Sequence, residues 1–284
     1  NETVNSLRSC KTGIGEMKNL ISVHAGEIPV AEVRASDEEL EELAAIRTRR
    51  YNSRTSLLGI IAAREALESS GLLEDMASCR TGLISATTVG GMDRSEKFFK
   101  SYMTNRSHGR LRHIVTHDCG DSTEAIANTF GIKDYVTTIS TACSSSANSI
   151  LTGARLIKNG LLDRVVAGGT DSLTLFTLNG FNSLMILDKE GCRPFDEERN
   201  GLTLGEGSGF IVMESEKIAV RAGKKILCEI TGYGNACDAY HQTASSPEGE
   251  GAYLAMKLAL ACSGLTVDKI DYINAHGTGT KNND

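Results

Sequence analysis

Residues 140–155 read STACSSSANSILTGAR and carry the clearest structural signal in the chain. A β-branched run at 135–139 precedes them directly, and the pattern becomes helical from about residue 145, which predicts a strand–turn–helix corner. Cys143 lies at the turn, where free backbone N–H groups and the positive end of the helix dipole favour a thiolate over a thiol. Small neighbours leave room for a carbonyl group. Cys143 is therefore a candidate nucleophile, and the alternative is a cysteine that only packs between strand and helix.

Strand and helix patterns alternate on both sides of this corner. Such alternation is typical of an α/β protein with a mainly parallel sheet covered by helices on both faces. No Pro- or Gly-rich linker divides the chain into independent domains. The predicted strands are 81–87, 135–139, 165–167, 209–213, 226–230 and 272–275, and the predicted helices are 37–70, a charged stretch ending near 102, 121–130, 145–159, 215–222 and 249–263.

Composition and charge exclude several classes of protein. The net charge of −6 argues against a nucleic-acid-binding protein, because such proteins carry a basic excess. No stretch approaches the run of about 18 apolar residues that a membrane span requires. The eight cysteines include no C-x-x-C pair, which disfavours a structural zinc site and a disulfide scaffold and indicates a reducing, cytoplasmic compartment. The chain begins at Asn1 rather than Met, and no signal-peptide pattern follows.

Residues 104–120 break the alternation and predict an irregular loop, because basic, polar and glycine residues are mixed there. The loop contains His108, His113 and His117. The spacing of four between the last two leaves a zinc site open as an alternative, although no helical pattern aligns their side chains. A solvated loop without bound metal is the favoured interpretation.

Three motifs together resemble the β-ketoacyl synthase family of condensing enzymes. They are TACSSS at 141–146, CRPFD at 192–196 with GEG at 205–207, and HGTGT at 276–280 followed by Asn283 and Asp284. They occur in the order that the family has. The resemblance implies an α/β, thiolase-like, layered αβαβα fold with mainly parallel, mixed sheets, incomplete here. Residues 1–232 would form the amino-terminal half without its first strand, and residues 233–284 the truncated beginning of the carboxy-terminal half.

The resemblance also implies a reaction. Cys143 would take an acyl group from a thioester on acyl carrier protein or coenzyme A, and a malonyl thioester would then lose carbon dioxide and attack the acyl-cysteine. His276 would stabilise the enolate oxygen by a hydrogen bond, and the Cys143 N–H would form part of an oxyanion hole. Thr278 and Thr280 would bind the phosphopantetheine arm, which arrives on the carrier protein, so no resident cofactor or metal is expected.

Two departures from the family pattern affect this interpretation. The family's second histidine and its lysine follow the HGTGT motif, and the chain ends at Asp284 before either, so we expect an amino-terminal fragment that is inactive alone. Leu202 stands where the family commonly has an aromatic residue near the nucleophile. Because leucine is smaller than an aromatic residue, we expect more space in the substrate site. The length of the acyl chain is not predicted, nor is the pathway, which is either fatty acid or polyketide biosynthesis.

Partners are implied in the same way. Arg47, Arg49, Arg50 and Arg54 form a basic cluster in an acidic protein, and the family uses a basic patch at the matching position to bind acidic acyl carrier protein. Arg47 and Arg50 are the predicted docking residues, and a solvated helix start is the alternative. The family also pairs the strand before the nucleophile with its copy in a second subunit, which makes 136–139 a predicted homodimer contact.

Three other functions stay open at this point. A non-catalytic, chain-length-factor-like partner subunit has the same fold, but it replaces the cysteine that this chain keeps. A thiolase-like acyltransferase also uses a cysteine, but the TACSSS and HGTGT motifs together are not typical of it. A cysteine hydrolase would need a base and an orienting acid, for which His241 and Asp238 are available.

Overall fold

The computed structural model describes residues 2–46, 51–73, 75, 78–241 and 245–284. At its centre is a four-stranded sheet with the order β4-β3-β5-β6. The strands β4 (Tyr135–Ile139), β3 (Thr81–Ala86) and β5 (Arg164–Asp171) run parallel, and β6 (Gly207–Glu214) is antiparallel to β5. The mainly parallel sheet predicted from the alternating pattern is confirmed.

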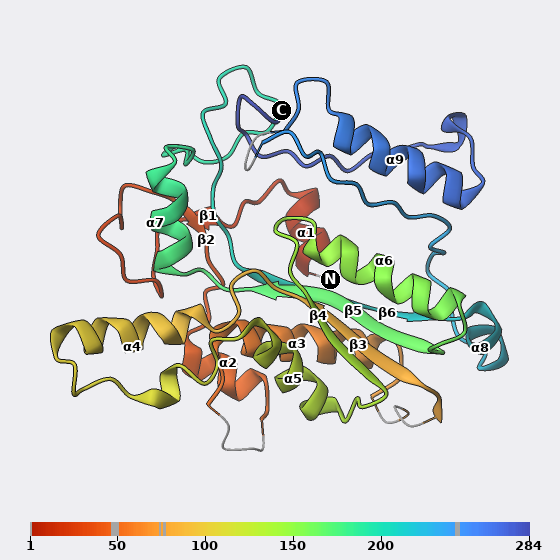
Figure 1. Ribbon diagram of the computed structural model, residues 1–284, viewed down its shortest axis with the longest axis horizontal. Coiled ribbons are helices and arrows are strands. Elements are labelled where there is room, and N and C mark those ends of the chain that lie inside the picture. The colour runs from red at the N-terminus through yellow and green to blue at the C-terminus, as the bar shows by residue number, and fades with distance from the viewer. Residues whose placement is uncertain (1, 47–50, 74, 76–77, 242–244) are drawn as a thin grey trace.

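Helices cover both faces of this sheet (Figure 1). On one face lie α3 (Arg54–Ser69) and α5 (Cys119–Phe130), and on the other lies α6 (Ser145–Lys158). The strands supply a separate core to each face, because successive side chains of a strand point in opposite directions. Leu83 and Val166 pack with α3 and α5, whereas Ile84 and Val165 pack towards α6.

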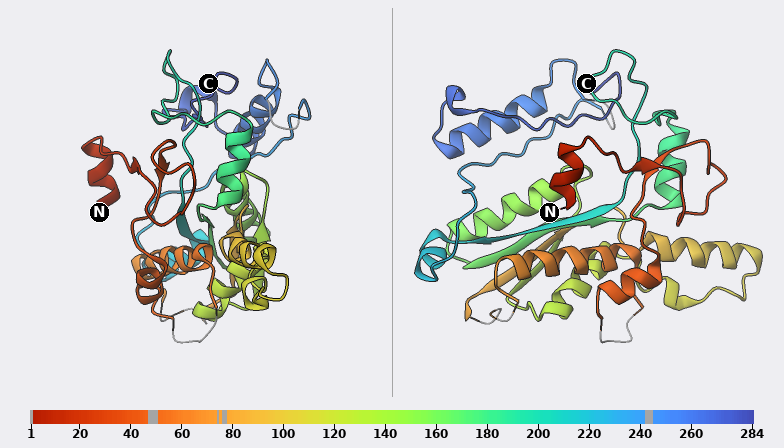
Figure 2. Two further views of the ribbon diagram at one scale, coloured as in Figure 1. Left: turned by 90° about the vertical axis from the view of Figure 1, so that its left-hand side faces the viewer. Right: turned by 180° about the vertical axis from the view of Figure 1, so that it is seen from behind.

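The remaining elements surround this layered centre. In Figures 1 and 2, α9 lies on the α6 side of the sheet, and α4 extends from the opposite side. These elements are α1 (Glu2–Arg8), the antiparallel pair β1 (Ile14–Gly15) and β2 (Val30–Ala31), α2 (Asp37–Leu43), α4 (Met92–Thr104), η2 (Leu111–His113), α7 (Leu175–Ser183), α8 (Glu216–Arg221), α9 (Glu250–Ser263) and η3 (Val267–Lys269). Among the described residues, no helix is both long and apolar enough to cross a bilayer.

Two sequence predictions about these elements are wrong. A single helix at 37–70 is not formed, because α2 ends at Leu43 and Ser53 caps a separate α3 by accepting a hydrogen bond from the Ser56 N–H. The predicted strands at 226–230 and 272–275 are not formed, because neither segment belongs to a strand of the structure. The chain just after 226–230 runs against a helix instead of a strand, since a Cβ on Gly232 or Gly234 would overlap the backbone of α9.

Candidate active site

Cys143 lies exposed in the turn between β4 and α6. The preceding Ala142 has φ 52°, in the left-handed region that costs an L-residue about 1–2 kcal/mol. The buried Ser145 holds this turn, because its hydroxyl accepts from the Thr141 N–H at 2.8 Å and donates to the Ala142 carbonyl at 2.6 Å. Backbone strain that is stabilised in this way is typical of functional turns. The predicted strand–turn–helix corner is confirmed, with an exposed thiol at its tip.

Close packing of α6 on the sheet sets the position of this turn. A Cβ on Gly169 of β5 would overlap the Ser146 hydroxyl, and the Ser149 hydroxyl donates to the Gly168 carbonyl at 3.0 Å. The first turn of α6 therefore lies directly over the end of β5. The carboxyl ends of β3, β4 and β5 meet at this edge of the sheet, where α/β proteins commonly bind ligands.

The HGTGT motif forms a loop that Asp284 stabilises. The Asp284 carboxylate accepts from the backbone N–H groups of Thr278 at 2.9 Å and Gly279 at 2.8 Å, and Asn283 donates to the His276 carbonyl. Desolvation acts to raise the pKa of Asp284, but the hydrogen bonds that it accepts outweigh this and hold the pKa well below its ordinary value. The loop is thus closed around an ionised carboxylate.

The CRPFD and HGTGT motifs, far apart in sequence, lie against each other. A Cβ on Gly277 would be 2.7 Å from the Pro194 Cβ, and a Cβ on Gly279, whose φ is +71°, would be 2.5 Å from the Gly201 carbonyl oxygen. The Gly201 N–H in turn donates to the Gly279 carbonyl at 2.9 Å. The two glycines of HGTGT are therefore required by close approach, of the Pro194 side chain at Gly277 and of the Gly201 backbone at Gly279.

The predicted site residues occupy two separate groups of contacts. Cys143 lies on the turn before α6, whereas His276, Thr278 and Thr280 lie on the loop that CRPFD supports, with the two threonine hydroxyls 2.8 Å apart. No hydrogen bond joins these two groups within the described residues, so the cooperation of Cys143 with His276 stays a prediction. Half-buried Leu202 lies beside the loop, next to Gly201, and its N–H donates to the Ile186 carbonyl.

Glu206, the acid of the GEG motif, connects three parts of the chain. Its buried carboxylate accepts from the N–H groups of Val33 and Leu173, both at 3.0 Å, and pairs with Arg54 at 2.7 Å. No role was predicted for Glu206, although an acid between two glycines before an apolar strand was a usable signal. Arg54 is buried in this pair and in a second one with Asp37, so its assignment to an exposed basic patch is wrong. Arg47 and Arg50 lie outside the described residues.

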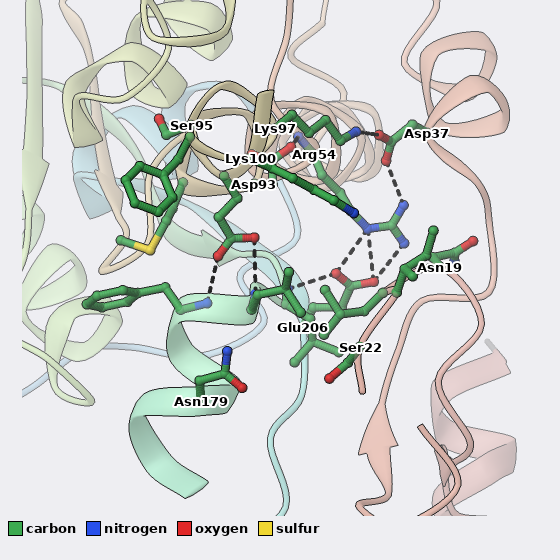
Figure 3. A pocket seen from close by; sticks show the side chains of 18 of the residues that line it. Asn19, Ser22, Asp37, Arg54, Asp93, Ser95, Lys97, Lys100, Asn179 and Glu206 are labelled. Atoms are coloured by element: carbon green, nitrogen blue, oxygen red, sulfur yellow. Dashed lines mark hydrogen bonds and ion pairs between the residues drawn. The ribbon is translucent and has the colours of Figure 1, made fainter. Parts of the chain in front are cut away.

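Glu206 and Arg54 are among the residues that line an open groove of about 1440 Å³, shown in Figure 3. Apolar side chains of the 19–23 segment, α4 and α7 form its walls, and the groove does not include Cys143. Burial raises the pKa of Asp93 and of Glu96. Burial acts in the same direction on Asp37, but Arg94, Arg54 and Lys97 outweigh it and hold the pKa of that carboxyl below its usual value. No sequence motif predicts this groove.

The three histidines of the predicted loop make separate contacts. His113 stacks on Tyr51 with 5.3 Å between ring centroids, and the His117 Nδ1 lies 2.9 Å from the Ser95 hydroxyl. Burial and the neighbouring cations Arg112 and Arg94 lower the pKa of His113. Among the residues with described positions, no group of three or more His, Cys, Asp or Glu side chains could hold a metal ion. The zinc alternative therefore has no support from the described residues.

Family models match nearly the whole chain. The model for the β-ketoacyl synthase N-terminal domain matches residues 2–219, and the model for the C-terminal domain matches residues 227–284. This chain belongs to the β-ketoacyl synthase family. The resemblance inferred from the three motifs is thereby confirmed, whereas the domain boundary predicted at 232 stays a prediction.

Curated relatives of this β-ketoacyl synthase family member are longer than the chain. Nodulation protein E of Rhizobium meliloti (strain 1021) is 34% identical over 284 residues, which cover 98% of this chain and 69% of that protein. The 3-oxoacyl-[acyl-carrier-protein] synthase 2 of Staphylococcus aureus (strain N315) is 33% identical over 268 residues, covering 91% and 63%. A second nodulation protein E of Rhizobium meliloti is covered over only 58% of its length. The chain thus spans roughly three-fifths to two-thirds of these relatives.

Solved structures share the fold. The ishigamide ketosynthase/chain length factor aligns with a TM-score of 0.93 at 29% identity, over all of this chain and 70% of that one. The ketosynthase ApeO, solved in complex with its chain length factor ApeC from Xenorhabdus doucetiae, aligns with a TM-score of 0.76 at 31% identity, over 96% and 66%. The predicted α/β, thiolase-like fold is confirmed.

Proposed function

We propose that the full-length protein containing this chain is a β-ketoacyl synthase that joins a cysteine-bound acyl group to a malonyl unit. The observation that carries the proposal is the exposed Cys143 thiol on a strained turn at the start of α6. An exposed thiol with free helix N–H groups beside it can attack a thioester and stabilise the resulting oxyanion. The name of the Staphylococcus aureus relative, a 3-oxoacyl-[acyl-carrier-protein] synthase, supports the same chemistry.

The reaction has two halves. The Cys143 sulfur attacks the carbonyl carbon of an acyl thioester, and the carrier thiol leaves with a proton. The malonyl thioester then releases carbon dioxide, and its enolate carbon attacks the acyl-cysteine carbonyl, which frees the Cys143 sulfur. His276 donates to the enolate oxygen, and Thr278 and Thr280 bind the phosphopantetheine arm of the acyl carrier protein. No cofactor beyond this arm is required.

The partners follow from the same proposal. A solved neighbour contains a ketosynthase with its acyl carrier protein, which supports a carrier-bound substrate here. The outermost strand β4 exposes Tyr135 and Val136, so a second subunit could extend the sheet there, and we propose a homodimer in the cytoplasm. Two of the solved relatives pair a ketosynthase with a chain length factor, so a different partner subunit at the same edge is the second candidate.

The test is acyl transfer to the full-length protein. After incubation with an acyl-carrier-protein thioester, intact mass should increase by one acyl group, and peptide mapping should place that group on Cys143. Cys143→Ala should abolish the increase, and Cys237→Ala, which removes another exposed thiol, should not. An acyl group that persists in Cys143→Ala, or no acylation of the parent protein, would refute the proposal.

The carrier surface needs its own test. Charge reversal of Arg47 and Arg50 to Glu should weaken acyl transfer from carrier protein and reduce its salt dependence, because complementary charge speeds encounter. Transfer from a small acyl thioester is the control and should stay unchanged. A carrier-protein rate that is insensitive to both reversals would exclude the docking role.

A further inference from the structure

A second cysteine, Cys192, contacts the HGTGT loop directly. Its Sγ–H donates to the Thr278 carbonyl at 3.2 Å, and its backbone N–H donates to the Thr203 hydroxyl at 2.9 Å. Cys192 begins the CRPFD motif, and residue 203 follows the Asn-Gly-Leu turn at 200–202. One residue thus connects two supporting segments to the loop that carries His276.

The peptide group between Thr278 and Gly279 is held at both of its polar ends. Cys192 donates to its carbonyl oxygen, and the Asp284 carboxylate accepts from its N–H at 2.8 Å. Because a peptide group is planar and rigid, two such bonds fix the orientation of the whole plane. A Cβ on Gly279 would lie 2.9 Å from the Cys192 sulfur, so the sulfur also touches the loop backbone. The contact is therefore a tight fit as well as a hydrogen bond.

The Cys192 thiol is suited to donate rather than to react. Burial raises its pKa, and the carboxylates of Asp284 and Asp188 act in the same direction. The thiol therefore keeps its proton at neutral pH, as a hydrogen-bond donor must. Cys143, in contrast, is exposed on its turn.

We propose that Cys192 is a positioning residue, whose thiol fixes the Thr278–Gly279 peptide and thereby places Thr278 and His276 for the malonyl half of the reaction. This inference rests on the proposed function. The Thr278 hydroxyl lies 2.8 Å from the Thr280 hydroxyl. Rotation of the Thr278–Gly279 peptide would therefore move both threonines that bind the carrier arm. Acylation of Cys143 by a small acyl thioester, which has no carrier arm, takes place on the separate α6 turn and does not use this contact.

The test compares Cys192→Ala, which removes the donor, with Cys192→Ser, which keeps one, in the full-length protein. Cys192→Ala should lower kcat/KM for decarboxylation of a malonyl thioester about five- to tenfold, the loss typical of one hydrogen bond, mainly through a higher KM. Cys192→Ser should restore most of this loss. Acylation of Cys143 by a small acyl thioester should be unchanged in both variants. Cys228→Ala, at an exposed cysteine, is the matched control.

Hydrogen–deuterium exchange separates this inference from the proposed function. The Thr278 and Gly279 amides should exchange about five- to tenfold faster in Cys192→Ala than in the parent or Cys192→Ser, whether or not the protein is active. Unchanged exchange and decarboxylation in Cys192→Ala would overturn the positioning role, and so would a Cys192→Ser variant as impaired as Cys192→Ala. An equal fall in acylation of Cys143 by the small thioester would also overturn it, because a general folding defect would then explain both losses. If the parent protein is not acylated at Cys143, the proposed function is wrong. The exchange data alone then show whether Cys192 holds the Thr278–Gly279 peptide.

Discussion

Ser145→Ala tests whether the strained turn at Cys143 is needed for acyl transfer. The substitution removes one hydroxyl that bonds the Thr141 N–H and the Ala142 carbonyl, on either side of the φ 52° residue. Two buried hydrogen bonds contribute about 1–3 kcal/mol to folding, and the left-handed Ala142 costs about 1–2 kcal/mol. The Ser144 hydroxyl still donates to the Thr141 carbonyl and the Ser145 N–H to the Ala142 carbonyl, but both side-chain bonds of Ser145 to the turn are lost. The turn should then relax toward a right-handed backbone.

The expected result is a loss of both stability and acylation. The left-handed conformation of Ala142 costs about 1–2 kcal/mol, which corresponds to a five- to thirtyfold lower population of the observed turn once the Ser145 bonds are lost. We therefore expect acylation of Cys143 to slow by about tenfold. Urea unfolding should show a decrease of about 1–3 kcal/mol in unfolding free energy. Mass spectrometry of the acylated protein over time measures the rate.

Ser183→Ala is the control, since exposed Ser183 lies on α7 and its hydroxyl donates only to the Gly180 carbonyl of its own helix. It should leave the acylation rate and the unfolding free energy close to those of the parent. If Ser145→Ala acylates Cys143 at the parental rate, the turn geometry is not what makes this cysteine reactive. If it unfolds at the parental urea concentration, the two hydrogen bonds do not stabilise the fold.

Three further substitutions test the surrounding structure. Gly279→Ala should lower the unfolding free energy by about 1–3 kcal/mol more than Gly264→Ala. Both glycines have positive φ, but only at Gly279 does a backbone atom lie 2.5 Å from a new Cβ. Equal decreases in the unfolding free energy measured in urea would contradict the close approach. Glu206→Gln should cost about 3 kcal/mol, the low end for a broken buried ion pair, because Arg54 loses the Glu206 carboxylate but keeps Asp37. Exposed Glu65→Gln should cost little, and similar urea midpoints for the two variants would be the contrary result. Burial raises the pKa of Asp93 in the folded state. The stability of the parent relative to Asp93→Asn should therefore be highest below about pH 4 and fall as pH rises through the raised pKa. If the difference in unfolding free energy between the two proteins does not change across that pH range, the carboxyl is not desolvated.

The central sheet could be predicted from the sequence because its strands and helices alternate with distinct periodicities. Strand β4 was predicted with its observed bounds, and α6 within one residue of them. The failures occurred where local pattern does not decide structure. Apolar runs at 226–230 and 272–275 have strand character, but a strand also needs a neighbour to satisfy its amides. The break between α2 and α3 depends on a cap at Ser53, a signal that is easily missed inside a long polar stretch.

The candidate site was predictable in its chemistry but not in its supports. Cys143 could be assigned from its strand–turn–helix context, whereas the role of Ser145 needed the observed hydrogen bonds across the turn. Glu206 and Cys192 were quoted only as motif letters, and their partners lie far away in sequence. Val33 and Thr278 are such partners, and no spacing rule connects them to their motifs.

The three motifs contain two kinds of residue, and the structure separates them. Cys143 and His276 carry groups that can take part in a reaction, and both are exposed. Gly277, Gly279 and Asp284 instead close the loop against the CRPFD segment, through close packing at the two glycines and the hydrogen bonds that Asp284 accepts. Because neither segment can keep this shape without the other, a change in CRPFD alters the loop that bears His276 although it touches no reacting atom. Variants of this support should therefore slow the malonyl half-reaction, while acylation of Cys143 by a small thioester stays close to the parental rate.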